Sequence, residues 1–266
     1  MKRDASGQRP PSIHVSSFVR GDSRPPIVLV HGAGNSSLVW LPWLREMGDR
    51  GWDLHAIDLR GHGASEPVEL SEVSMGDYVA DVAGVVEGLK RPPILFGWSM
   101  GGLIAQMYGS TRPTLPAMVL FAPSPPLGVQ GEGNRKDAAD IAEIFGPEEY
   151  GVDINDRSGG PAMFDLTEFE VASVRPGLGF ESGLARRERK IGIDVLPLAM
   201  PVLVVHGGRD ESHPPAEARA VASYHHGTTV EHAEAGHWGV VASREIVKEL
   251  APRVNEWLAV SLKAER

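Results

Sequence analysis

The chain has 266 residues, of which 42% are hydrophobic and 23% are charged, and its formal net charge is −9. It has no cysteine, which excludes disulfides, thiolate metal sites and cysteine nucleophiles. The acidic excess argues against a nucleic-acid partner, because phosphate binding needs clustered Lys and Arg. The basic run ARRERK (185–190) contains an acidic residue and is expected to be a solvated face.

The N-terminus does not have the pattern of a targeting segment. The sequence MKRDASGQRPPSIHV has no apolar region after its basic residues, as a secretory signal would require. No window approaches the roughly 20 apolar residues of a membrane span, so we expect a cytoplasmic protein without a stable membrane anchor. Residues 1–22 are expected to form a loose arm (1–11) and then an alternating edge strand (12–19).

Beyond the arm, apolar strand segments alternate with helical segments. Short buried strands are expected at 25–32, 52–57, 92–97, 116–122, 201–207 and 228–233. Helices are expected at 37–51, 74–89 with Ser74 as N-cap, 100–110, 215–225 and 244–262, the last kinked or broken at Pro252. This alternation predicts an α/β fold with a mostly parallel central sheet flanked by helices, built from residues 23–122 and 200–266.

Residues 123–199 interrupt the alternation and are expected to be a helical lid (cap) insertion. They are rich in Gly and Pro, with a helix-like stretch at 136–146 and the segment PAMFDLTEFEVASV at 161–174. The alternative is a disordered surface loop. Against that alternative stand the apolar residues of the segment: Ile141, Ile144, Phe145, Met163, Phe164, Leu166 and Phe169.

The stretch FGWSMGG (96–102) joins an expected strand to an expected helix and matches Gly-x-Ser-x-Gly. A sharp turn at this point would expose the Ser99 hydroxyl at the carboxyl end of the sheet, where open α/β sheets bind ligands. Gly97 and Gly101 would relieve the crowding of the backbone around that turn. Ser99 is therefore a candidate nucleophile, with an incidental serine as the alternative.

A serine nucleophile needs a base and an acid that orients the base. His237 follows the last expected strand and Asp210 follows the strand before it, so these two residues are the candidates. Glu211 is the rival acid, and Asp194 is a weaker one. The remaining histidines considered for the base are expected to be structural or exposed: His31, His55, His62, His225 and His226.

An oxyanion hole needs two N–H donors beside the nucleophile. The backbone amide of Met100, at the start of the helix, is one candidate. The backbone amide of Ala33, in the tight loop HGAGNSS (31–37), is the other. In this loop His31 is expected to shape the chain rather than to act as a base.

The chain resembles the α/β-hydrolase fold superfamily, in its serine esterase and lysophospholipase-like branch. The resemblance rests on five motifs in order: VLVHGAG, AIDLRGHGAS, GWSMGG, VLVVHGGRD and AGHWG. It spans residues 25–122 and 200–262. Trp98 departs from the His of many members, although Gly-Trp-Ser also occurs in pimeloyl-carrier methylesterases. The resemblance implies a cofactor-free hydrolase of carboxylic esters that works through an acyl-enzyme.

Other activities stay open at this point. An amidase, a lactonase or a perhydrolase would use the same three residues, and a ligand-binding member of the fold would use none of them. Dehalogenases and epoxide hydrolases need a carboxylate in place of Ser99, and a hydroxynitrile lyase usually needs a nearby Lys that the motifs lack. We expect no bound metal, although His206, Asp210 and His213 form a loosely spaced alternative set.

The substrate is expected to be a small, apolar ester. Trp98, Asn35 and Trp238 lie beside the candidate residues in sequence and are expected to line the pocket. Met163 and Phe164 of the insertion are expected to close over it. The alternative is that the aromatic residues of the insertion only pack it onto the core.

Overall fold

The computed structural model of the protein describes residues 9–21, 23–131 and 138–264. Within these residues a seven-stranded sheet runs in the order β1-β3-β2-β4-β5-β8-β9. Six strands are parallel, and β1 pairs with β3 in the antiparallel direction. The strands are β1 (Val15–Phe18), β2 (Ile27–Val30), β3 (Leu54–Ile57), β4 (Ile94–Trp98), β5 (Met118–Phe121), β8 (Val202–Gly207) and β9 (Thr228–His232). The mostly parallel sheet predicted from the alternating pattern is confirmed.

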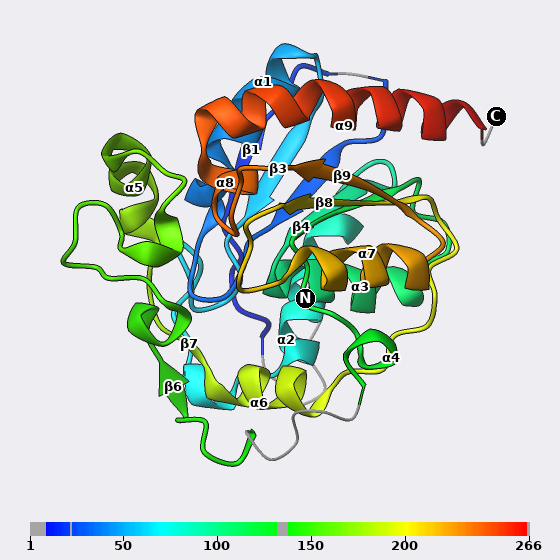
Figure 1. Cartoon of the computed structure of the whole chain (residues 1–266). Helices are drawn as coiled ribbons and strands as arrows, with labels where there is room; N and C mark the ends of the chain where they lie inside the picture. The colour runs from blue at the N-terminus through cyan, green and yellow to red at the C-terminus, as the bar shows by residue number, and fades with distance from the viewer. Residues whose placement is uncertain (1–8, 22, 132–137, 265–266) are drawn as a thin grey trace.

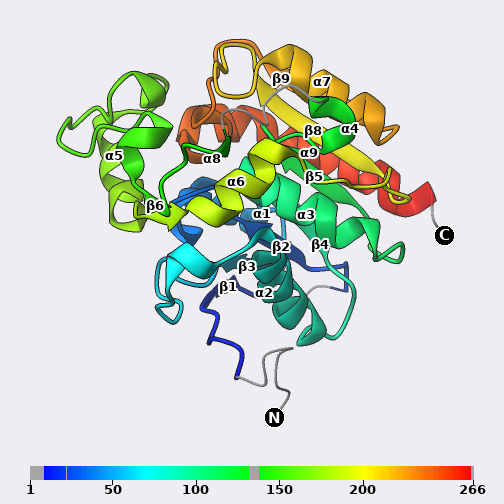
Figure 2. The same cartoon turned by 90° about the horizontal axis from the view of Figure 1, so that it is seen from below.

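Helices cover both faces of the sheet, as Figure 1 shows. One face packs against α1 (Leu41–Asp49), α8 (Gly239–Ala242) and α9 (Arg244–Ala264). The other packs against α2 (Met75–Glu87), α3 (Met100–Ser110) and α7 (Pro215–Tyr224). In Figure 2, α2 and α3 lie in front of the strands. Ile27 and Leu29 of β2 point to the first face, and Val28 and Val30 point to the second, because side chains alternate along a strand.

The sequence explains where the helices begin and end. Ser74 caps α2 as predicted: its hydroxyl accepts from the amide of Asp77, whose carboxylate accepts from the amide of Ser74. The segment predicted as one helix at 37–51 is a 3-10 turn, Ser37–Trp40, followed by α1. Helix α9 continues through Pro252, so of the predicted kink or break the break is wrong.

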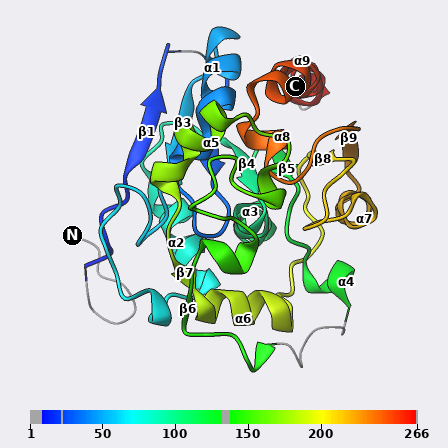
Figure 3. The ribbon, with the colours of Figure 1, turned by 60° about the vertical axis from the view of Figure 1, so that its left-hand side comes forward.

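Residues 123–199 lie between β5 and β8, which are direct neighbours in the sheet. The segment contains α4 (Leu127–Gln130), β6 (Ile144–Phe145), α5 (Glu168–Val174), β7 (Glu181–Ser182), α6 (Gly183–Ile191) and several 3-10 turns. In Figure 3 its helix α5 lies in front of the sheet. The helix-like stretch at 136–146 contains no α-helix where it is described, and Ile144 and Phe145 pair with β7 instead.

The expected arm lies outside the described residues as far as residue 8. None of the described helices combines the length and the apolar character that crossing a bilayer would take.

Candidate active site

Ser99 occupies the turn between β4 and α3 in an unusual backbone conformation. Its φ is 53° and its ψ is −119°, a region that residues other than glycine rarely adopt. Such strain costs about 1–3 kcal/mol and persists only where the surroundings enforce it. The amide of Ser99 donates to the carbonyl of Phe121 on the neighbouring strand at 3.0 Å, which holds the turn against the sheet.

The glycines around Ser99 allow the close packing of this turn. A Cβ at Gly97 would overlap the carbonyl oxygen of Gly101 in the following helix. A Cβ at Gly101 would overlap the carbonyl oxygens of Val30 and His31 at the end of β2. Both positions need glycine because backbone, which cannot move aside, occupies the space of a side chain.

A hydrogen bond joins His237 to Asp210. The Nδ1 of His237 lies 2.9 Å from the Oδ2 of Asp210. The other carboxylate oxygen of Asp210 accepts from the amides of Ser212 and His213, each at 2.9 Å. Burial raises the pKa of Asp210, but its electrostatic interaction and hydrogen bond with His237 and the hydrogen bond from the amide of His213 outweigh burial and hold the pKa below its usual value. An ionised Asp210 keeps the proton of His237 on Nδ1 and leaves Nε2 free to accept one.

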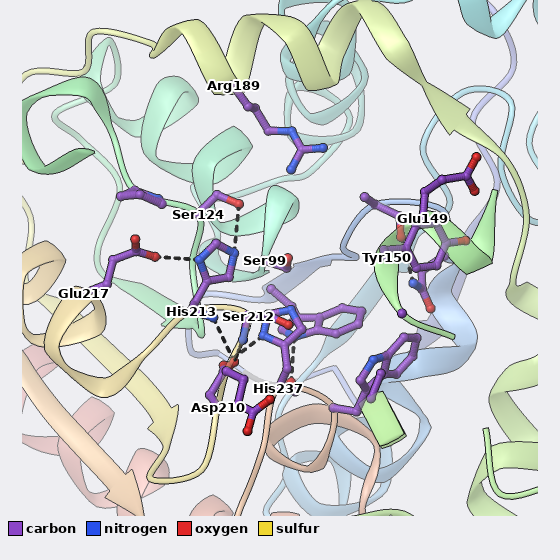
Figure 4. A pocket seen from close by; sticks show the side chains of 18 of the residues that line it. Ser99, Ser124, Glu149, Tyr150, Arg189, Asp210, Ser212, His213, Glu217 and His237 are labelled. Carbon is purple, nitrogen blue, oxygen red and sulfur yellow. Dashed lines mark hydrogen bonds and ion pairs between the residues drawn. The ribbon is translucent and has the colours of Figure 1, made fainter. Parts of the chain in front are cut away.

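Ser99, Asp210 and His237 line one cavity of about 1230 Å³. Figure 4 shows the three side chains together on its wall. No hydrogen bond joins Ser99 Oγ to His237 Nε2, although both residues are among those described. Such bonds are often long in enzymes without substrate and tighten when the substrate binds.

Two free backbone amides lie close to Ser99. The loop after β2 approaches so closely that a Cβ at Gly32 would lie 3.1 Å from the Cβ of Ser99. Ala33, the next residue, lines the cavity. Neither Ala33 nor Met100, the first residue of α3, donates its amide to any described residue. Two unpartnered donors beside a hydroxyl are suited to bind a developing oxyanion.

Four of the five predicted pocket residues line the cavity: Trp98, Asn35, Trp238 and Phe164. The indole of Trp98 donates to the carbonyl of His237 at 3.1 Å, and its ring centroid lies 5.2 Å from that of His237. Met163 differs from the expectation. Its side chain is fully buried in the hydrophobic core and is not part of the cavity wall.

The rival residues have other partners. His31 is buried, with Nδ1 donating to the carbonyl of Gly32 at 2.8 Å and Nε2 accepting from the amide of Leu59 at 3.0 Å. Burial lowers the pKa of His31 to about 4. Glu211 is exposed and makes no bond to His237. Among the described residues no group of His, Asp or Glu side chains is arranged to hold a metal ion, and the set of His206, Asp210 and His213 does not form one.

Two acids of the insertion contact the loops of the site, and the sequence did not indicate them. Glu181 on β7 is fully buried and accepts from the amide of Gly34, beside Ala33, at 3.0 Å. Asp165 accepts from the amides of Gly236, at 2.5 Å, and Gly239, at 2.9 Å, which flank His237. Their separation of up to 147 residues from these partners leaves no local pattern that could have revealed them.

The interpretation of ARRERK as a solvated face is wrong. The run lies on α6, and Arg186, Arg189 and Lys190 line the cavity. His213 also lines it, with Nδ1 2.6 Å from the carboxylate of Glu217. The cavity wall is therefore partly charged, in contrast to the apolar pocket expected from the tryptophans.

Comparisons with known proteins show the family and the fold of the chain. A model described as the alpha/beta hydrolase family matches residues 27–249. The chain is 28% identical over 226 residues to pimeloyl-[acyl-carrier protein] methyl ester esterase of Aeromonas salmonicida, covering 77% of this chain and 84% of that protein. An esterase from Thermogutta terrifontis superimposes with a TM-score of 0.69 at 21% identity, covering 94% of this chain and 93% of the other. A hydrolase from Pseudomonas aeruginosa gives 0.72 at 20% identity and covers 96% of each chain.

Proposed function

Since the chain belongs to the alpha/beta hydrolase family, we propose that it is a serine hydrolase that cleaves carboxylic esters through an acyl-enzyme intermediate. The observation that carries the proposal is the strained turn at Ser99, which shares one cavity wall with the His237–Asp210 pair. A relative named as a methyl ester esterase, aligned over most of both chains, supports an ester as the substrate class.

In the first half of the reaction, His237 Nε2 takes the proton of Ser99 as Oγ attacks the ester carbonyl. Asp210 stabilises the imidazolium that forms, because its carboxylate accepts from Nδ1 at 2.9 Å. The amides of Ala33 and Met100 bind the tetrahedral oxyanion, each contributing roughly 10²–10³ in rate. His237 then gives its proton to the alcohol oxygen, the ester bond breaks and the acyl group remains on Ser99.

In the second half, water replaces the alcohol. His237 takes a proton from the water as its oxygen attacks the acyl carbonyl, and the same two amides bind the second oxyanion. The proton returns to Ser99 Oγ as the acyl bond breaks and the carboxylic acid leaves. We further propose that the insertion acts as a lid, since it supplies Tyr150 and Phe164 to the cavity wall.

The test is labelling with a fluorophosphonate probe together with hydrolysis of p-nitrophenyl esters. We expect wild type to be labelled on Ser99 and to hydrolyse the esters, and Ser99→Ala to do neither while keeping its fold. Ser110→Ala is the matched control. Ser110 ends helix α3, which begins directly after Ser99; its hydroxyl donates to the carbonyl of Met107, and it does not line the cavity. An unlabelled wild type, or full activity in Ser99→Ala, would contradict the proposal.

A further inference from the structure

Helix α6 presents a basic face to the cavity. Arg186, Arg189 and Lys190 are spaced so that they share one side of the helix, and all three line the cavity. Arg187 lies on another side, where its guanidinium donates to the carbonyl of Ile141 at 2.9 Å. The basic residues that face the cavity are therefore those on one side of α6, and not every basic residue of the run.

Most charged groups of the cavity wall have partners within the protein. Asp210 pairs with His237, and Glu217 pairs with His213. The guanidinium of Arg186 lies 4.4 Å from the ring centroid of Phe145. Asp210, Glu217 and Arg186 therefore have partners within the protein.

Arg189 is different. Its Nε is buried and has no hydrogen-bond partner, and its guanidinium forms no ion pair with any described residue. Figure 4 shows the guanidinium pointing from α6 into the cavity, on the side where Ser99 lies. Burial lowers the pKa of Arg189 from its usual value, the direction expected for a cation removed from water.

The acid that acts on Arg189 from a distance is already engaged. Glu181 is fully buried and influences Arg189 electrostatically. Its carboxylate accepts from the hydroxyl of Tyr78 at 2.5 Å and from the amide of Gly34 at 3.0 Å, and it faces His62 at 3.3 Å. Glu181 therefore leaves the guanidinium donors of Arg189 directed at the cavity.

We propose that Arg189 binds a negatively charged group of the substrate, so that this cavity favours esters that carry a carboxylate or a phosphate away from the scissile bond. The inference rests on the proposed function. A planar guanidinium with several donors binds such an oxyanion group through two parallel hydrogen bonds. A cavity of about 1230 Å³ has room for a substrate that reaches from Ser99 to a second, anionic end.

The experiment compares kcat/KM for pairs of esters that differ only in charge. Monomethyl esters of linear dicarboxylic acids, paired with the ω-carboxamide methyl esters of equal length, place the charge in the acyl part. Acyl esters of glycerol phosphate, paired with the same esters of glycerol, place it in the alcohol part. We expect wild type to favour the charged member of one series by about tenfold to a hundredfold, the usual effect of a hydrogen bond to a charged group.

Arg189→Met should abolish that preference while hydrolysis of the neutral ester is little changed, and Arg189→Lys should restore part of it. Arg187→Met, on the same helix but outside the cavity wall, should keep the preference. Equal activity of wild type on both members of each pair, or an equal loss on both in Arg189→Met, would overturn the inference.

Binding of the same esters to Ser99→Ala, measured by calorimetry, separates this inference from the proposed function. Preference for the charged ester in that variant, without hydrolysis by wild type, would overturn the proposed function alone. Equal affinity for charged and neutral esters would overturn the role of Arg189.

Discussion

Trp98 connects the turn that carries Ser99 to the segment that carries His237. Its backbone ends β4 directly before Ser99, and its indole donates to the carbonyl of His237 at 3.1 Å. The ring also lies 4.9 Å from that of Trp238, centroid to centroid. A single buried side chain thus fixes the distance between the candidate nucleophile and the candidate base.

Trp98→Phe should therefore lower kcat by about fivefold, the effect of one hydrogen bond of about 1 kcal/mol. The reason is that the His237 carbonyl loses its donor and the imidazole loses part of its packing. The measurement is kcat and KM on one p-nitrophenyl ester, together with the free energy of unfolding in urea.

Trp52→Phe is the matched control for that variant. Trp52 is equally buried and its indole donates to Asn255 at 2.9 Å, but it does not line the cavity. We expect a similar loss of stability in both variants and a loss of kcat only in Trp98→Phe. Equal kcat in the two would contradict the positioning role of Trp98.

At the scale of elements, the insertion is hydrogen-bonded to two loops of the site: the loop after β2 and the loop that carries His237. Glu181 on β7 accepts from the amide of Gly34, beside the candidate oxyanion donor Ala33, and Asp165 accepts from the amides of Gly236 and Gly239 on either side of His237. The insertion is thus part of the framework of the site as well as its proposed cover, because its acids satisfy backbone donors of the core.

Asp165→Ala should lower kcat by about tenfold or more, since small displacements of a catalytic group cost up to about a hundredfold. Two loop amides would lose their acceptor, and the His237 segment would loosen. Asp165→Asn keeps an acceptor oxygen and should retain most of kcat. Steady-state kinetics on a p-nitrophenyl ester would measure both.

Asp153→Ala is the control for this prediction. Asp153 also belongs to the insertion and accepts from two backbone amides, but these belong to Asn155 and Asp156 and not to the His237 segment. The positioning role of Asp165 is wrong if both alanine variants lose kcat to the same extent, or if Asp165→Asn is as slow as Asp165→Ala.

The sequence predicted the elements whose signals are local. Helix α3 begins and ends where expected, because the Gly-x-Ser-x-Gly turn marks its start. The internal structure of the insertion escaped prediction because its contacts join distant positions and its strands have two residues each. The sequence also failed to predict which side of α6 faces the cavity. Polar residues lie on both sides of this helix, and both sides contact the protein: Glu188 accepts from the amide of Met75, while Arg189 lines the cavity.

At the scale of the whole molecule, buried histidines make stability depend on pH. Burial lowers the pKa of His31 and of His225 from 6.5 to about 4. Between these two values the unfolded chain binds protons that the folded protein does not, so acidification favours unfolding there. His62 has the opposite effect above pH 6.5, where acidification favours the folded protein. Burial lowers the pKa of His62, but its ion pair with Glu181 outweighs this and raises the pKa overall.

Of these two histidines His225 is the better one to test, because His31 belongs to the loop that carries Ala33 at the cavity wall. It is buried between α3 and α7, with Nε2 2.9 Å from Gln106 Oε1 and Nδ1 accepting from the amide of Leu198 at 3.3 Å. Protonation of Nδ1 would break the second bond and bury a charge without a counter-ion, which is the physical cause of the lowered pKa.

His225→Gln should start less stable at pH 7 but lose about 2 kcal/mol less than wild type on going to pH 4.5, as linkage requires when a group with a folded pKa of about 4 is removed. Urea unfolding at both pH values measures this. His226→Asn, at the exposed neighbour, is the control and should keep most of the loss, since the desolvation of His225 remains. If the loss in His225→Gln equals that of wild type, then His225 titrates at the same pH in the folded and unfolded chain, and the acid sensitivity must come from His31 and the other buried groups.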